Sequence, residues 1–182
     1  MASEIIVQTL RGPSSGANAN KIIVPSGQTL DASGGALVPS AGQVVQIQQN
    51  TYSTWTTTTS TNWGSTGLTC PITPKFLTSE LLVHITIAGG YLGSTSEIMY
   101  LALYRDGSLV SRLDDTFGHV YGGNGISGAW TFRHTAPTTS ATTYQLYWTT
   151  NNIGTIGINN YAGRLGANYN TKSTMTITEV AQ

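Results

Sequence analysis

Charged side chains are scarce in this chain of 182 residues. They make up 9% of it, with 8 Lys and Arg against 8 Asp and Glu, whereas an average soluble domain carries about 25%. The cationic residues stand singly, so the clustered positive field that nucleic-acid binding requires is missing. We therefore expect no nucleic-acid partner, and a surface kept soluble by Thr, Ser, Asn and Gly.

Cysteine and long apolar runs are equally scarce. Cys70 is the single cysteine, which excludes an intramolecular disulfide and a cysteine-based metal site. We expect it to be a small buried hydrophobe, because its neighbours form a strand-like run. No apolar stretch approaches the roughly 20 residues of a membrane span. Glu4 lies in an N-terminus without an apolar h-region, so we expect no secretory signal, synthesis in a cytoplasm and no membrane insertion.

Catalytic motifs are missing as well, since the chain has no GxSxG, no HExxH and no phosphate-cradling glycine loop. Asp114, Asp115 and His119 form the most site-like polar cluster. No further ligand stands at a motif spacing, and a strand end followed by a loop explains them as well. Glu80 and His84 have the same parity on a predicted strand, where they would face one side and interact. We expect no catalytic residue, no metal site, no cofactor and no enzyme activity.

The composition and the hydrophobic pattern of the chain change near residue 45. Residues 1–42 are sparsely hydrophobic, with short apolar runs at 5–7 and 22–24 and a turn at 25–27. Strands this short are unstable in isolation, so they must pack against something else. We predict two domains: an anchoring arm, 1–42, and a compact knob, 43–182. The predicted anchoring residues of the arm are Ile5, Ile6, Val7, Ile22, Ile23 and Val24.

A period of two runs through the knob and predicts β-strands. Nine are expected, at 45–56, 67–72, 80–88, 97–104, 108–113, 126–134, 142–150, 155–159 and 173–180. Within 142–150, Tyr144, Leu146 and Trp148 alternate with polar neighbours, which is typical of antiparallel strands with one wet face. Asp106-Gly107 predicts a tight hairpin turn.

These strands predict an all-β, antiparallel β-sandwich or jelly roll. Trp55, Trp63 and Trp148 are expected to pack in the core or at a subunit interface. The predicted core consists of Phe76, Leu81, Val83, Ile85, Met99, Leu101, Leu103, Leu146 and Ile177.

Aromatic residues beside Gly and Asn mark three loops as candidate receptor contacts. A flat ring covers the apolar face of a sugar or protein partner while amides satisfy its polar groups. The same composition also suits loops that cap a sandwich or pack a trimer axis, so both interpretations stand. The candidate residues are Tyr91, His119, Tyr121, Asn124, Tyr161, Arg164 and Tyr169.

Several phrases resemble short fibre-like virion proteins of tailed bacteriophages. In the knob these are TSTNWGSTGLTCPITPKFLTSELLVHITI at 59–87, LALYRDGSLV at 101–110, APTTSATTYQLYW at 136–148 and KSTMTITEVAQ at 172–182. The arm phrase ANKIIVPSGQTLDASGG, 19–35, is similar to N-terminal segments of phage tail-fibre and structural proteins.

This resemblance implies a non-enzymatic virion protein, made in the host cytoplasm and displayed on the virion surface. It implies a homotrimer with a jelly-roll knob like that of tumour-necrosis-factor-like proteins, held on a capsid or tail protein by the arm. Tail fibres, head fibres and capsid decoration proteins all use such modules. The chain is short and has no extended shaft, which favours a compact appendage. A tail-fibre tip that binds a host glycan is the alternative.

Overall fold

The computed structural model describes residues 13–17, 19, 23, 25–28, 39–93, 97–117, 126–152, 154–159 and 171–182. The chain divides into two compact units, Met1–Val38 and Pro39–Gln182. In the first unit, the predicted turn at 25–27 is present, because the Gln28 amide donates to the Pro25 carbonyl at 3.0 Å. Ile23 is 56% exposed. The other five predicted anchoring residues, Ile5, Ile6, Val7, Ile22 and Val24, lie outside the described ranges.

The second unit, here called the sandwich, is built from strands. Its described part holds ten strands and no helix. The strands are β1 (Val44–Tyr52), β2 (Thr56–Thr58), β3 (Gly64–Ile72), β4 (Glu80–Leu92), β5 (Met99–Arg105), β6 (Ser108–Phe117), β7 (Ile126–Thr135), β8 (Thr142–Thr150), β9 (Ile156–Ile158) and β10 (Ser173–Val180).

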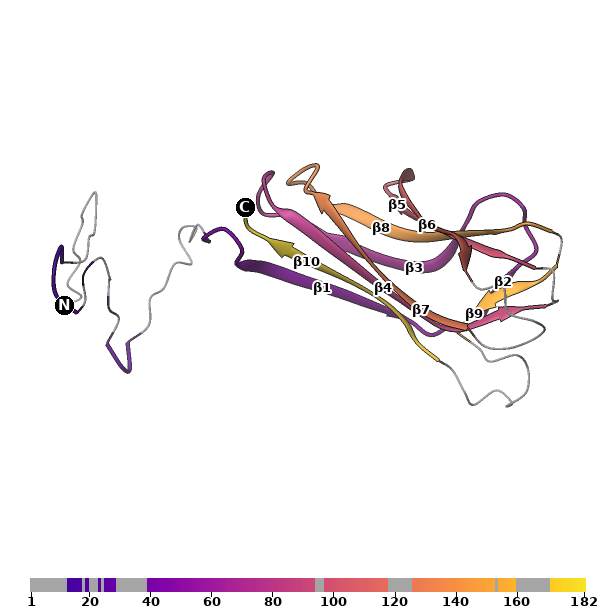
Figure 1. Cartoon of the computed structure of the whole chain (residues 1–182), viewed down its shortest axis with the longest axis horizontal. Coiled ribbons are helices and arrows are strands. Elements are labelled where there is room, and N and C mark those ends of the chain that lie inside the picture. Colours follow the sequence, from indigo (N-terminus) through magenta and orange to yellow (C-terminus); the bar gives the residue numbers. More distant parts are fainter. Residues whose placement is uncertain are drawn as a thin grey trace, which may run out of the picture. The chain divides into compact units, whose positions relative to one another are not determined.

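The strands form two sheets in which every pairing is antiparallel (Figure 1). In the first sheet, the order is β1-β10-β4-β7, and β9 and β2 extend it beside the last residues of β4. In the second sheet, the order is β3-β8-β5-β6. Most strands that follow one another along the chain cross between the sheets, whereas β5 and β6 form a hairpin within one sheet, which is the double Greek-key pattern of a jelly roll. The prediction of an all-β, antiparallel fold is confirmed.

The core lies between the sheets and follows the predicted alternation. Along β8, Tyr144, Leu146 and Trp148 are buried, whereas Thr143, Gln145 and Tyr147 are partly exposed. The predicted core residues are buried with one exception, since Phe76 is partly exposed. Phe76 lies between β3 and β4, where its backbone amide is hydrogen-bonded to the Glu179 carboxylate. This contact fixes its backbone outside the strand alternation, so the prediction for Phe76 is wrong.

The single strand predicted at 45–56 is interrupted. β1 ends at Tyr52, opposite Ser173, the first residue of its partner β10. The chain then turns through 53–55 and resumes as β2, which pairs with β9. The strand predicted at 97–104 begins instead at Met99. Both differences arise because a strand extends only as far as a neighbouring strand offers hydrogen-bonding groups.

The hairpin turn predicted at Asp106-Gly107 is confirmed. Both residues have positive φ, at 46° and 79°, as tight hairpin turns require. The Asp106 carboxylate also accepts hydrogen bonds from the Thr142 hydroxyl and, at 2.8 Å, from the Thr143 amide. These two bonds lower the pKa of Asp106. They tie the hairpin to the start of β8.

Candidate functional site

An aromatic pair, with one ring exposed and the other partly exposed, lies beside the short strands β2 and β9. Tyr91 in β4, a predicted receptor contact, has its ring centroid 5.9 Å from that of Trp55, with the planes inclined by 56°. Trp55 is 38% exposed and does not enter the core. A Cβ added at Gly157 would lie 2.9 Å from the Trp55 ring. The ring can therefore pack closely on β9 because residue 157 has no side chain. We call Trp55 and Tyr91 the end pair.

Buried hydrogen bonds of Asn159 hold the corner that carries Trp55. The Asn159 side chain is fully buried and donates to the Thr54 carbonyl at 3.0 Å. Its Oδ1 accepts bonds from the Ser173 amide at 3.0 Å and the Ser173 hydroxyl at 2.6 Å. The Asn159 backbone amide donates to the carbonyl of Ala88 in β4. One side chain thus joins the β1–β2 corner, β9 and β10, so the backbone beneath Trp55 is fixed rather than a free loop.

The end pair lies at the opposite end of the sandwich from residue 39. At the start of the sandwich, the Gly42 amide donates to the Ala181 carbonyl, and the Ala181 amide donates to the Gln43 carbonyl. From there β1 and β10 run side by side, until Tyr52 meets Ser173 at their other ends. β2 and β9 lie beyond that point (Figure 1). The residue 39 end connects to the first unit, and the other end displays Trp55 and Tyr91.

A second aromatic group lies on the outer face of the β3-β8-β5-β6 sheet. The rings of Tyr104 and Tyr147 are stacked at 4.2 Å with an interplanar angle of 24°. The Trp63 ring lies 6.5 Å from Tyr104. The guanidinium carbon of Arg112 is 5.8 Å from the Trp63 ring centroid, within the range of a cation–π contact. We call these four residues the aromatic row.

The aromatic row was not predicted as a site, although its signal is present in the sequence. Tyr147 occupies a position on the wet face of the 142–150 alternation, and Tyr104 follows the buried Leu103. An aromatic residue on a wet face is conspicuous, but pairing Tyr104 with Tyr147 requires the β5–β8 register. Three tryptophans were expected in the core or at a subunit interface. Trp148 is buried, whereas Trp55 and Trp63 lie at the surface of the sandwich.

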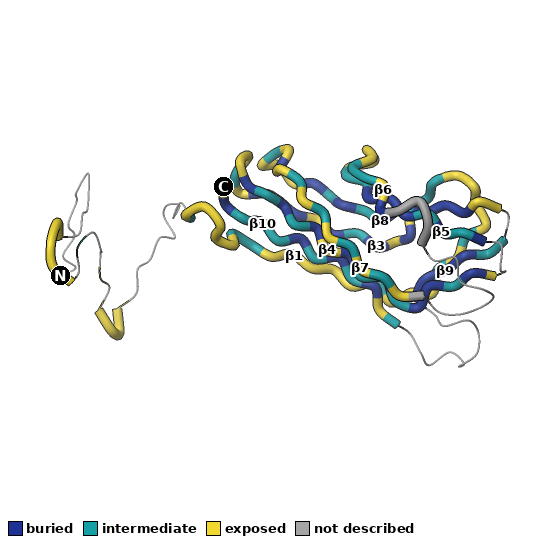
Figure 2. The backbone as a smooth tube through the Cα atoms, in the orientation of Figure 1, coloured by how far each residue is buried: buried dark blue, intermediate teal, exposed yellow. Residues whose placement is uncertain are grey.

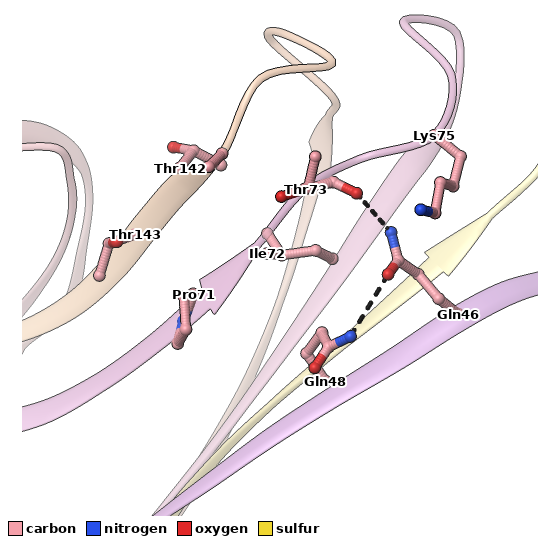
Figure 3. A pocket seen from close by; sticks show the side chains of 9 residues that line it. Gln46, Gln48, Pro71, Ile72, Thr73, Lys75, Thr142 and Thr143 are labelled. Atoms are coloured by element: carbon pink, nitrogen blue, oxygen red, sulfur yellow. Dashed lines mark hydrogen bonds between the residues drawn. The ribbon is translucent and has the colours of Figure 1, made fainter.

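A pocket of about 410 Å³ opens between β1, the end of β3 and the start of β8 (Figure 3). Gln46 Nε2 reaches the Thr73 carbonyl at 2.7 Å, and Gln48 Nε2 lies 3.4 Å from Gln46 Oε1. Further along, Asn50 Nδ2 donates to the Thr69 carbonyl at 2.8 Å. The amide side chains of β1 therefore bond backbone carbonyls of β3 and of the residue that follows it, and these polar contacts help to join the two sheets on this side. The lining residues are Gln46, Gln48, Pro71, Ile72, Thr73, Lys75, Ala141, Thr142 and Thr143.

Glu179 lies buried behind this pocket. Its carboxylate accepts bonds from Gln46 Nε2 at 2.6 Å and from the amides of Lys75 and Phe76 at 2.8 and 3.1 Å. Burial by itself raises the pKa of Glu179, but these hydrogen bonds outweigh it and lower the pKa. The ionised carboxylate anchors the 73–79 connection to β10, which is a structural role.

The polar residues considered for chemistry have structural partners or lie outside the described part of the chain. Glu80 and His84 share a face as their parity predicts. Glu80 forms a bidentate ion pair with Arg133, and His84 lies 2.9 Å from the Thr131 hydroxyl. Cys70 is buried, which raises the pKa of its thiol to about 11, so it is protonated at neutral pH.

The side chains of Asp114 and Asp115, and the whole of His119, lie outside the part of the chain that the structure describes. So are the predicted receptor contacts Tyr121, Asn124, Tyr161, Arg164 and Tyr169. Within the described residues, no three His, Cys, Asp or Glu side chains gather as a metal site would require. The same residues include no helix that is long and apolar enough to cross a membrane.

Comparisons with known proteins leave the family open. No protein-family model matches the chain, and a search of curated proteins returned no match. Among solved structures, the chain is similar to the VP2 subviral particle of infectious bursal disease virus, with 13% identity and a TM-score of 0.46. The similarity covers 93% of this chain, which spans 45% of the length of that protein. A likeness at this level is too low to assign a fold or a function.

Proposed function

We propose that this chain is a structural protein of a tailed-phage virion, a compact homotrimeric appendage that carries out no catalysis. The arm anchors it to a capsid or tail protein, and the jelly roll is displayed on the particle surface. The observation that carries the proposal is the division at residue 38 together with a self-contained core. Among the described residues, every member of the core cluster lies between Tyr52 and Ile177, inside the second unit.

The proposed partner contact lies in the arm. Its short apolar runs, with Ile5, Ile6 and Val7 in one and Ile22, Ile23 and Val24 in the other, suit strand addition to a sheet edge of a capsid or tail protein. The resemblance of the segment 19–35 to phage structural proteins supports the same assignment. Anchoring by strands requires no pocket or catalytic group.

Trimer formation would also protect an exposed edge. β1 is an edge strand and is largely exposed (Figure 2). Its residues Val44 and Ile47 are 56% and 60% exposed. Open edges with apolar residues promote uncontrolled pairing unless another chain covers them. A closed ring of three copies removes such edges from solvent.

Localisation tests this function directly. Purified virions that carry a labelled copy of the full chain should show the label at regular surface positions by electron microscopy. Light scattering on the free protein should give the mass of three chains. Absence of the chain from purified particles would refute the virion assignment, and a free monomer would refute the trimer.

Recognition of a host glycan is the second candidate, and the end pair favours it. An exposed Trp held by buried hydrogen bonds, at the end away from residue 39, is suited to stack against a sugar ring. Trp55→Ala and Tyr91→Ala should each weaken binding of the protein to host cells at least tenfold. Leu77→Ala, a change at another exposed apolar residue, should have no effect. Equal cell binding by all four proteins would exclude the end pair as the contact.

A further inference from the structure

The aromatic row has a defined arrangement on the outer face of the second sheet. Ala102 is in register with Tyr147 on one side and Arg112 on the other, so these residues share that face. Ala102 is fully buried although it points away from the core, because its larger neighbours close over it. Tyr104, Tyr147 and Trp63 themselves remain partly exposed. The three aromatic rings therefore form one surface on the sheet, with the small Ala102 side chain beneath them.

The described part of this face carries positive charge. Among its described side chains, Arg112 is charged and none is acidic, the neighbours being Ser65, Thr69, Thr143, Gln145, Tyr100 and Leu109. Within the described residues, the ion pair is Glu80–Arg133, on the other sheet. Arg112 is exposed and lies over the Trp63 ring. A guanidinium that lies over a ring keeps its in-plane N–H groups available for a carboxylate.

The outer face of the first sheet provides a contrast. Thr174, Thr176 and Thr178 of β10 lie there, and the described groups bond one another. Gln49 Nε2 donates to the Thr176 hydroxyl at 2.9 Å, while the two ring nitrogens of His84 lie 2.9 Å from Thr131 Oγ1 and 3.3 Å from Thr86 Oγ1. Hydroxyl groups on that face suit water, whereas the described part of the second sheet's outer face displays aromatic rings and the Arg112 guanidinium.

We propose that the aromatic row binds a saccharide that carries a carboxylate, such as a uronic or sialic acid residue of a cell-surface polysaccharide. The apolar C–H face of one sugar ring packs against Trp63, with the tilted Tyr104 ring beside it. The carboxylate binds the in-plane N–H groups of Arg112. This site is distinct from the end pair and from the arm, so it does not depend on either.

Calorimetric titration of the full-length protein with acidic sugar oligomers tests the proposal. The probes are oligomers of galacturonate, glucuronate and N-acetylneuraminate, with a galactose oligomer of equal length as the neutral comparison. We expect saturable binding of at least one acidic oligomer, at least tenfold tighter than the neutral one, and weaker at high salt. Arg112→Gln should weaken it at least tenfold and Trp63→Ala should abolish it. Arg133→Gln, which removes a cation from the other sheet, should leave it unchanged.

Three results would overturn the proposal. The first is that no acidic oligomer binds, and the second is that Arg112→Gln binds as tightly as the wild type. The third is that Trp63→Ala or Arg112→Gln changes the mass of the protein in solution, because the aromatic row would then be a contact between copies of this chain. Circular dichroism of each variant shows whether it is folded, and Arg112 is exposed enough that its replacement preserves the fold. Each of these results is independent of whether the arm anchors the protein to a virion.

Discussion

At the scale of single residues, Gly67 fixes how β1 packs against β3. Its φ is +92°, and a Cβ added there would lie 2.6 Å from Cζ of Tyr52. The Tyr52 hydroxyl is hydrogen-bonded to Thr56 Oγ1 at 2.7 Å, so the ring cannot easily move away. Gly67 also lies in the irregularity of the β3–β8 register between Ser65 and Thr69. The position therefore requires both the backbone freedom and the small size of glycine.

We expect Gly67→Ala to destabilise the sandwich by about 2 kcal/mol, because it combines a disfavoured φ with a steric clash. Gly64→Ala is the matched control, since nothing lies within 4 Å of a Cβ at that position in the same strand and its φ is not positive. Urea denaturation of both variants measures the difference. Equal midpoints for the two variants would contradict this account of Gly67.

Glu179 makes the stability of the sandwich depend on pH. Its folded-state pKa lies below the ordinary value of 4.5, because hydrogen bonds to the buried carboxylate outweigh the effect of burial. A depressed folded-state pKa gives stability that is complete above the unfolded value. That stability is lost as the pH falls through the folded-state pKa. Glu179 therefore makes the stability of the sandwich depend on pH in the acidic range.

We expect Glu179→Gln to lower the free energy of unfolding at pH 7 by roughly 2 kcal/mol, the scale of a hydrogen bond to a charged group. As the pH falls below 4.5, the gap between wild type and variant should narrow, because the wild type loses its ionised carboxylate. Denaturation curves from pH 7 to pH 3 measure it. A gap that stays constant over this range would show that Glu179 does not titrate as described.

At the scale of elements, the strands could be predicted because their side chains alternate. Tyr144, Leu146 and Trp148 of β8 reveal period two within a few residues, and Asp106-Gly107 marks its hairpin locally. The break between β1 and β2 could not be predicted, because it depends on distant partners. Thr56–Thr58 is uniform in sequence, and its separation from β1 arises from pairing with β9 and from Asn159, about a hundred residues away.

The residues of the candidate site likewise come from different strands. Tyr91 could be singled out from its Gly-rich surroundings, but its neighbour Trp55 is brought to it by pairing of β4, β9 and β2. The aromatic row depends on the register of β5 with β8 and β6. A pattern along one strand shows which residues face outward, and it does not show which outward residues become neighbours.

Asn159 is expected to hold this corner of the elements together. Asn159→Ala removes the buried side-chain hydrogen bonds to Thr54 and Ser173. The alanine must also adopt φ +66° without the hydrogen bonds that hold the asparagine in that conformation. We expect a loss of about 2–4 kcal/mol, since unpaired buried polar groups are costly. Asn62→Ala, at an exposed turn, should change stability by less than about 0.5 kcal/mol. Chemical denaturation compares them, and a loss below 1 kcal/mol for Asn159→Ala would contradict the role assigned to it.

At the scale of the whole molecule, the chain consists of two units. The sandwich holds its own core, closes one side with amide side chains, and displays the end pair away from residue 39. The proposed role of the first unit is attachment. If this division is correct, attachment and folding are separable, since removing residues 1–38 leaves Gly42 and Gln43 in their hydrogen bonds with Ala181.

The most direct test of this account is the fraction of protein that co-sediments with virions that lack it, for the full chain and for residues 39–182. We predict that the shortened protein keeps its β-sheet circular dichroism, its unfolding temperature and its mass in solution, and that its attachment falls to background. The arm fused to an unrelated carrier should attach. Attachment of residues 39–182 at the level of the full chain would contradict the central claim that the arm is the anchor.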